Sequence, residues 1–159
     1  MNWIISKSKK MQWHTHLDVL FEPMCDEIEK YNWILSDIEY NGTDNYVDLP
    51  INYNHDYFIL PPDEFKRLVN IDIQIYWGII LAIPISKEIV IDEAELPYAE
   101  GNPLIWEDGN IQHPDAVMEI ICFDSGYTIV KFRDEAISDR FKTYFDEAES
   151  LQAFNAKWK

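Results

Sequence analysis

The stretch IDIQIYWGIILAIPI, residues 71–85, is the longest apolar run in the chain and decides the fold. Its β-branched and aromatic side chains favour a strand, because such side chains pack well on a pleated surface. The run is nearly continuous in hydrophobicity from residue 75 onward, which predicts a central strand with both faces covered. It is shorter than the ~18 apolar residues that a membrane-spanning helix needs, and Asp72, Gln74 and Pro84 interrupt it. We therefore expect a core strand, which by itself indicates no chemistry.

The segment before this strand is expected to hold several strands and two helices. An amphipathic helix is predicted to begin at a Thr15 cap, with Pro23 kinking it or delaying its start. Asn41-Gly42 is a strong two-residue hairpin signal, so the chain should return as a strand along residues 46–49. The other expected elements are strands over residues 2–6, 32–40 (half-exposed) and 53–60 and a short helix opening at 61–64.

The segment after the central strand is expected to end in a strand–turn–strand–helix unit. Residues 117–123 and 127–132 have strand patterns joined across a short turn, and Asp134 is placed to cap a helix whose apolar positions recur as far as Leu151. Between the two parts, residues 92–114 are rich in turn residues, so they form either a functional loop or short strands that the pattern misses.

This order of elements predicts the fold class. Strands grouped together, with helices between and after them, are typical of an α+β protein with a mostly antiparallel sheet and helices packed mainly on one face. With 159 residues, no internal repeat and no low-complexity tract, the chain is expected to form a single domain over residues 1–159.

Charge is the most unusual property of the composition. Thirteen Lys and Arg stand against 29 Asp and Glu, which gives a net charge of −16. This charge would repel nucleic acid and anionic membrane surfaces, so neither is expected as a partner, whereas a basic protein is. The first residues show no apolar core of a signal peptide, so a cytoplasmic location is expected, with Cys25 and Cys122 reduced and buried.

No catalytic or metal-binding signature is present, so we expect neither an enzyme nor a cofactor. His14 and His16 are two residues apart at a helix entrance, where their side chains diverge, so a zinc site is not expected. His55 and His113 each lie close to a carboxylate in sequence, but such near neighbours do not form a catalytic pair. We interpret both histidines as polar turn residues.

The distribution of charge gives the strongest functional signal. No Lys or Arg occurs in residues 31–65 or 88–130, although both windows contain many acids with Tyr and Trp residues between them. Aromatic rings among acids on loops are typical of a protein-binding patch, in which rings anchor the partner and charges steer it. A solvated acidic face with inward-packed aromatics is the open alternative. The predicted partner-binding residues are Asp92, Glu93, Glu95, Tyr98, Glu100, Trp106, Glu107 and Asp108.

Two segments carry a resemblance to a known class of proteins. The acidic loop DEAELPYAEGNPLIWEDGN (92–110) and the closing unit MEIICFDSGYTIVKFRDEAISDRFKTYF (118–145), in a small acidic chain, resemble immunity proteins of bacterial polymorphic and contact-dependent growth inhibition toxin systems. The resemblance implies a cytoplasmic antitoxin that binds a cognate toxin domain, often a basic nuclease, and blocks or covers its active site. The alternative is a small enzyme or ligand-binding domain with a pocket beside residues 92–114, where His55 or His113 would meet a carboxylate distant in sequence.

Overall fold

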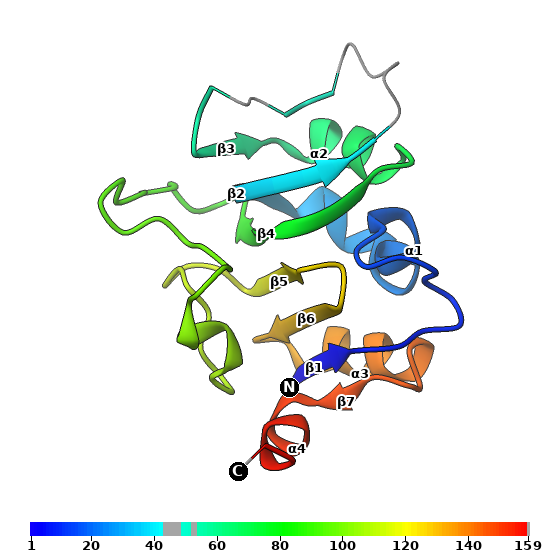
Figure 1. Cartoon of the computed structure of the whole chain (residues 1–159). Helices are drawn as coiled ribbons and strands as arrows, with labels where there is room; N and C mark the ends of the chain where they lie inside the picture. The colour runs from blue at the N-terminus through cyan, green and yellow to red at the C-terminus, as the bar shows by residue number, and fades with distance from the viewer. Residues whose placement is uncertain (43–48, 52–53, 159) are drawn as a thin grey trace.

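A seven-stranded antiparallel sheet, in the order β3-β2-β4-β5-β6-β1-β7, forms the middle of the molecule (Figure 1). The computed structural model describes residues 1–42, 49–51 and 54–158. The elements are β1 (Asn2–Ile5), α1 (Leu17–Phe21), the 3₁₀ helix η1 (Glu22–Lys30), β2 (Tyr31–Asn41), β3 (Tyr57–Leu60), α2 (Pro62–Val69), β4 (Gln74–Pro84), the 3₁₀ helix η2 (Pro103–Trp106), β5 (Met118–Phe123), β6 (Tyr127–Phe132), α3 (Glu135–Tyr144), β7 (Glu149–Ser150) and α4 (Leu151–Ala156). The predicted α+β class with an antiparallel sheet is confirmed.

Strand β4 is the covered strand that the apolar run predicts. It pairs with β2 on one side and β5 on the other. Ile79 and Leu81 belong to the core on one face of the sheet and Ile80 and Ala82 to the core on the other, and none of these side chains is exposed. Both faces of β4 are therefore buried.

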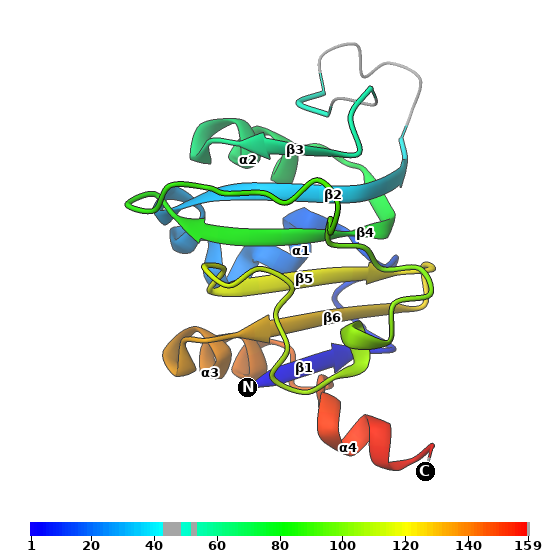
Figure 2. The same ribbon diagram turned by 90° about the vertical axis from the view of Figure 1, so that its left-hand side faces the viewer.

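The two faces of the sheet are covered by different kinds of structure. Helices α1, η1, α2 and α3 cover one face, where Trp33 stacks on Phe65 with ring centroids 4.0 Å apart. Residues 85–117 and α4 cover the other face, and the segment crosses in front of the strands in Figure 2. Helices therefore pack mainly on one face, as expected, and an irregular segment does most of the covering on the other.

The first helix differs from the prediction at its start. Helix α1 begins at Leu17 after His16, with no side-chain cap, because the Thr15 hydroxyl instead hydrogen-bonds the Thr128 hydroxyl, 2.7 Å away. The break near Pro23 is present, since Met24 has non-helical dihedral angles inside η1. The predicted Thr15 cap is therefore wrong, and the predicted kink is confirmed.

The closing helix is also shorter than its pattern predicts. Asp134 caps α3 by accepting the Ile137 N–H at 3.0 Å, as expected. The helix ends at Tyr144, and β7 and α4 follow, because Leu151 packs in the core on the opposite face of the sheet. The single helix expected as far as Leu151 is wrong.

The expectations for β2 and for the two cysteines can also be compared with the structure. The first half of β2 is buried rather than half-exposed, and Cys25 is exposed. Cys122 is buried as expected, and burial raises the pKa of its thiol to about 12. The expected return strand over residues 46–49 lies almost entirely outside the described residues.

Candidate binding surface

Residues 85–117 form a loop layer that is held to the sheet by buried polar side chains. Its one regular element is η2, and no strand occurs in it, so of the two alternatives for residues 92–114 the short strands are excluded. The Asn102 amide donates to the Tyr98 carbonyl at 2.9 Å and to Gln112 Oε1 at 2.8 Å. Gln112 in turn donates to Glu119 Oε1 at 2.8 Å, which connects the loop layer to β5. These contacts give the loop layer a defined path without secondary structure.

A buried ion pair lies beneath the loop layer. Glu119 on β5 and Lys131 on β6 are register partners, and Lys131 Nζ lies 3.6 Å from Glu119 Oε2 with both side chains fully buried. Lys131 also donates to the Leu104 carbonyl of η2 at 3.0 Å. Burial raises the pKa of the Glu119 carboxyl and lowers that of the Lys131 ammonium, and each group partly offsets the shift of the other. The pair therefore fixes η2 against β6.

An acidic cleft opens where β2 meets the loop layer. Its cavity of about 340 Å³ is lined by Ser36, Asp37, Ile38, Glu39, Ile51, His55, Asp56, Phe58, Leu96, Pro97 and Tyr98. Ser36 Oγ donates to the Pro97 carbonyl at 2.5 Å, and the Ala99 N–H donates to Asp37 Oδ2 at 3.4 Å. The cleft thus brings together the two windows of sequence that contain no Lys or Arg.

A bulge in β2 gives the cleft its shape. The register between β2 and β4 shifts after Ser36, and Asp37 adopts a positive φ of 56°. Opposite the bulge, Gly78 has a φ of 142°, and a Cβ there would lie 2.4 Å from the Ile38 side chain. Only glycine fits this position without strain, so Gly78 permits the bulge that holds Asp37 at the cleft.

The carboxylates of the cleft lie close enough to influence one another. Burial raises the pKa of Asp37, with smaller contributions in the same direction from Glu39 and Asp56, although the Ala99 N–H opposes the shift. At the outer rim, the Tyr57 hydroxyl donates to Glu93 Oε1 at 3.2 Å, which raises the pKa of Tyr57. The cleft therefore brings like charges together, and a bound cation would reduce the repulsion between them.

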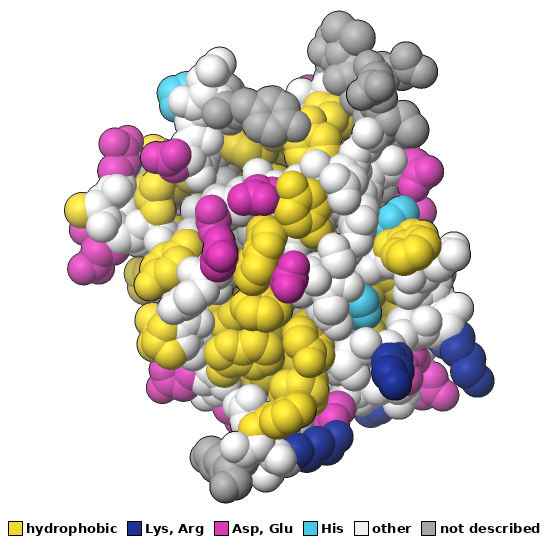
Figure 3. Space-filling view, viewed as in Figure 1, with side chains coloured by type: hydrophobic (Ala, Val, Ile, Leu, Met, Phe, Trp, Pro, Cys, Tyr) yellow, Lys and Arg dark blue, Asp and Glu magenta, His cyan; other side chains and the backbone are white. Residues whose placement is uncertain are grey.

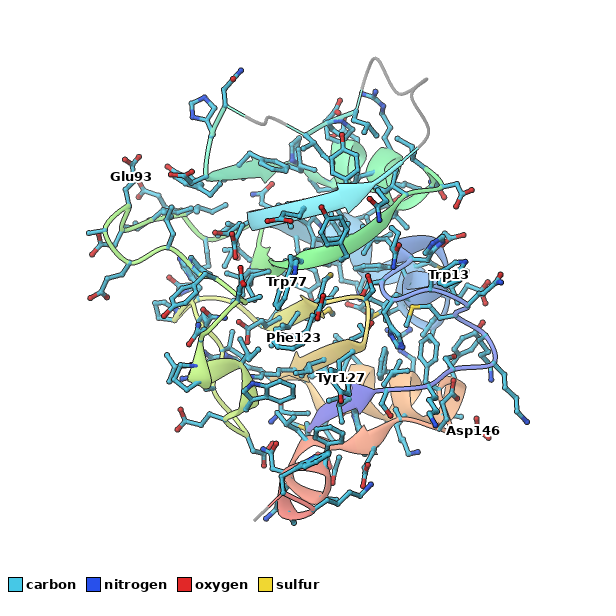
Figure 4. All side chains as sticks on the ribbon, viewed as in Figure 1. Trp13, Trp77, Glu93, Phe123, Tyr127 and Asp146 are labelled. Carbon is cyan, nitrogen blue, oxygen red and sulfur yellow. The ribbon has the colours of Figure 1, made fainter. Side chains whose placement is uncertain are left out.

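A row of half-buried aromatic side chains continues from the cleft across the sheet. Trp77, Phe123 and Tyr127 are register partners on β4, β5 and β6, with successive ring centroids 4.6 and 6.2 Å apart. Trp106 of η2 and Phe154 of α4 extend the row, since Trp106 lies 5.1 Å from Phe123 and 6.1 Å from Phe154. We call these five residues the aromatic stripe. Figure 4 shows its first three members one above another across the strands.

The predicted partner-binding residues fall into two groups. Asp92, Glu93 and Glu95 are exposed at one end of the loop layer, and Glu93 lies at the upper left of Figure 4. Tyr98 lines the acidic cleft, and Glu100 is exposed close to it in sequence. At the other end, Trp106 joins the aromatic stripe, Glu107 is exposed, and exposed Asp108 accepts a hydrogen bond from Asn2. The eight residues share one layer without forming one cluster.

Sequence reasoning missed the other members of the site. The sequence places Trp77, Phe123 and Tyr127 in predicted strands and Asp37, Glu39 and Asp56 in an acidic window, without marking them as site residues. The aromatic residues on either side of the 124–126 turn gave a signal, because residues that flank a hairpin turn face each other across it.

Nine acids of this surface differ in their charge pairing from three acids of the helical face. Within the described residues, none of Asp37, Glu39, Asp56, Asp92, Glu93, Glu95, Glu100, Glu107 and Asp108 forms an ion pair. On the helical face, by contrast, Arg140 binds Asp26 and Glu27, and Lys66 binds Glu29. Figure 3 shows acidic and hydrophobic side chains gathered on the face that carries the aromatic stripe. These nine acids therefore give this surface negative charge that no described Lys or Arg compensates by an ion pair.

The histidines have separate roles. His113 Nδ1 accepts the Asp115 N–H at 3.1 Å, so its Nε2 must donate to the Val90 carbonyl 2.9 Å away, and both ring nitrogens serve the loop layer. His55 is exposed at the acidic cleft. Over the described ranges, no three His, Cys, Asp or Glu side chains are grouped to hold a metal ion.

Comparison of the chain with protein-family models, curated proteins and solved structures found no match. Nor does any helix in the described part of the chain have the length and apolar character needed to cross a membrane.

Proposed function

We propose that this chain is an immunity protein, a cytoplasmic antitoxin that neutralises a basic toxin domain by stoichiometric binding rather than by catalysis. One observation carries the proposal: nine acids of the loop layer and the acidic cleft form no ion pair within the described residues, whereas Asp26, Glu27 and Glu29 on the helical face are bound to Lys and Arg. Repulsion among like charges costs folding free energy, so a surface that keeps them unpaired fits a role in which a cationic partner compensates them.

The proposed binding has two components. Glu93, Glu95 and Glu107 would attract a basic toxin and occupy positions where a nuclease binds the phosphates of its substrate. The aromatic stripe would supply the apolar contact that holds the complex, because aromatic side chains contribute most to the centres of protein interfaces. We expect association to approach ~10⁸ M⁻¹s⁻¹ at low salt and to slow steeply as salt is added. An association rate that does not change with salt would contradict the electrostatic component.

The first partner to test is the C-terminal domain of a large toxin gene next to the gene for this chain. Co-expression of this protein with that domain should preserve growth of the host cells. The triple variant Glu93→Lys, Glu95→Lys, Glu107→Lys should lose this protection while unfolding at nearly the same temperature as the wild type, because all three side chains are exposed. Protection that survives the triple reversal would place the interface elsewhere.

A matched control separates local from overall charge. Asp18, Asp63 and Asp139 are exposed acids on α1, α2 and α3, on the helical face of the sheet. Reversing these three to Lys changes the net charge by the same amount as the loop variant. We expect the control to retain protection, and equal loss in both variants would mean that only the total charge matters.

A small-ligand or enzymatic role for the acidic cleft is the second candidate. It is favoured by one observation, which is that His55 lines the same cavity of about 340 Å³ as Asp37 and Glu39, both distant in sequence. The variant His55→Gln distinguishes the two roles. Protein binding driven by carboxylates should be retained, whereas acid–base chemistry that uses this imidazole would be lost.

A further inference from the structure

The lower end of the aromatic stripe opens into a pocket that the proposed function does not yet explain. Its cavity of about 350 Å³ is lined by Trp106, Tyr127, Phe154, Asn155 and Trp158, and we call it the aromatic pocket. η2, β6, α4 and the turn that follows α4 contribute these residues. Four of the five lining side chains are aromatic, so almost any group that enters must contact a ring.

The rings of the aromatic pocket differ in orientation. Trp106 and Phe154 are nearly parallel, at 12°, with centroids 6.1 Å apart. Tyr127 is steeply inclined to both, at 83° to Trp106 and 72° to Phe154. Trp158 lies 6.3 Å from Phe154 and is 76% exposed, so one wall faces solvent. The pocket therefore presents ring surfaces from several directions and remains open to a side chain from outside.

Asn155 brings a hydrogen-bond acceptor to the aromatic pocket. Asn155 Nδ2 donates to the Trp106 carbonyl at 2.6 Å, so among the described residues the Asn155 side-chain oxygen is left free to accept a hydrogen bond. A group that enters the pocket and donates N–H bonds would satisfy this oxygen. An aliphatic side chain would fill space without doing so.

The charges around the aromatic pocket favour a cation. Lys157, next to Trp158 in sequence, is bound to Glu149 at 2.6 Å, and Lys131 is buried with Glu119. Glu107, which follows Trp106, is exposed and has no ion-pair partner among the described residues. In the described part of the chain, these two cations are thus neutralised, and Glu107 is not paired. The faces of aromatic rings also attract cations through their quadrupole.

We propose that the aromatic pocket receives an arginine side chain of the basic partner protein, an inference that rests on the proposed function. A guanidinium group is planar, stacks on aromatic faces, is more weakly hydrated than an ammonium group and carries five N–H donors. It therefore matches the ring walls, the free Asn155 oxygen and the negative surroundings together. The arginine anchors the partner at one end of the aromatic stripe, while the acidic cleft holds other cations at the opposite end.

The test uses small probes and needs no partner. The ¹⁵N-labelled protein is titrated with Nα-acetyl-arginine methylamide while the indole N–H signals of its six Trp residues are followed by NMR. The signals of Trp106 and Trp158 should move, and that of Trp13, an exposed Trp outside the pocket, should not. The citrulline derivative has nearly the same shape without the charge, and the norleucine derivative is apolar. Both should bind at least about tenfold more weakly, because a desolvated cation–π contact is worth ~2 kcal/mol.

Variants at two exposed tryptophans provide the matched pair. Trp158→Ala should abolish the response of Trp106 to the arginine probe, whereas Trp13→Ala should leave it unchanged. Equal or tighter binding of the norleucine probe would overturn the inference in favour of an aliphatic occupant. Absence of any shift at Trp106 would overturn it outright.

The result of the arginine titration can be distinguished from the result of the protection assay that tests the proposed function. If arginine fails to bind but the loop reversals still abolish protection, the arginine pocket is wrong and the immunity role stands. If arginine binds but the chain protects against no toxin domain, the pocket is established and the immunity role is wrong.

Discussion

Replacing Lys131 with Met should destabilise the protein strongly, because it removes one half of a fully buried ion pair. Glu119 would keep only the Gln112 amide at 2.8 Å as a partner, and the Leu104 carbonyl would lose its donor. Removing one member of a buried pair costs about 3–5 kcal/mol, because the remaining charge is left uncompensated in the core. The loss should fall mainly on the loop layer, since both lost contacts connect η2 and β5 to β6.

Urea denaturation followed by fluorescence measures this cost. With a slope of about 2 kcal/mol per molar urea, a loss of about 4 kcal/mol lowers the midpoint by about 2 M. The loss should also depend on pH. Burial already raises the pKa of Glu119 above 4.5, and without Lys131 the main opposing influence is gone. Above pH 4.5 the folded variant then holds a proton that the unfolded chain releases, so its stability should decline as pH rises from 5 to 7.5.

The double variant Glu119→Gln, Lys131→Met is the control. It removes both charges and keeps similar volumes, so its unfolding midpoint should lie much closer to that of the wild type. Its stability should also lack the decline with pH. If Lys131→Met alone is as stable as the double variant at pH 7.5, the buried charges do not hold the loop layer and the reasoning fails.

Three further predictions concern the scaffold. Gly78→Ala should lower the free energy of unfolding by about 1–3 kcal/mol in thermal denaturation, because its φ of 142° and the adjacent side chain leave no room for a Cβ, whereas Gly126→Ala should cost less. Burial lowers the pKa of His14, so the unfolded chain takes up a proton near pH 6.5 that the folded chain resists, and stability should fall as pH drops below 6.5. The decrease of the urea midpoint with falling pH should be smaller in His14→Gln and should persist in His55→Gln. Asp134→Ala should cost about 1 kcal/mol through loss of the α3 cap, and an unchanged melting temperature would show that the cap is dispensable.

Sequence patterns correctly predict those helices and strands whose structure is decided by residues close together in the chain. The continuous apolar run predicted β4, and the two strand patterns around residues 124–126 predicted the β5–β6 hairpin. The predicted closing helix extends too far along the chain. Helical spacing indicates that residues are buried, but it does not indicate which of the two cores they join. Phe145 packs with the helices, and Leu151 packs with the loop layer. The chain must cross from one face to the other between them.

The candidate site depends on contacts between residues that are far apart in the sequence, and the spacing of residues cannot predict such contacts. Asp37 and Tyr98 line one cleft only because the β2 bulge and the Leu96–Pro97 segment meet at the same end of the sheet. The aromatic stripe depends on the register that places Trp77 opposite Phe123. Composition could show that acids and aromatics are interleaved. It could not show that nine acids without an ion pair among the described residues lie on one face, while Arg140 and Lys66 pair with acids on the other.

The loop layer and the helices contact opposite faces of the same sheet, and this separation has an evolutionary consequence. Substitutions on the outer surface of residues 92–108 lie a full layer of backbone away from the aromatic core around Trp33. If the loop layer binds a partner as proposed, selection can change which partner is recognised without altering the packing of the helices. A scaffold organised in this way suits a lineage in which partners diversify quickly, because recognition and folding are encoded in different parts of the chain.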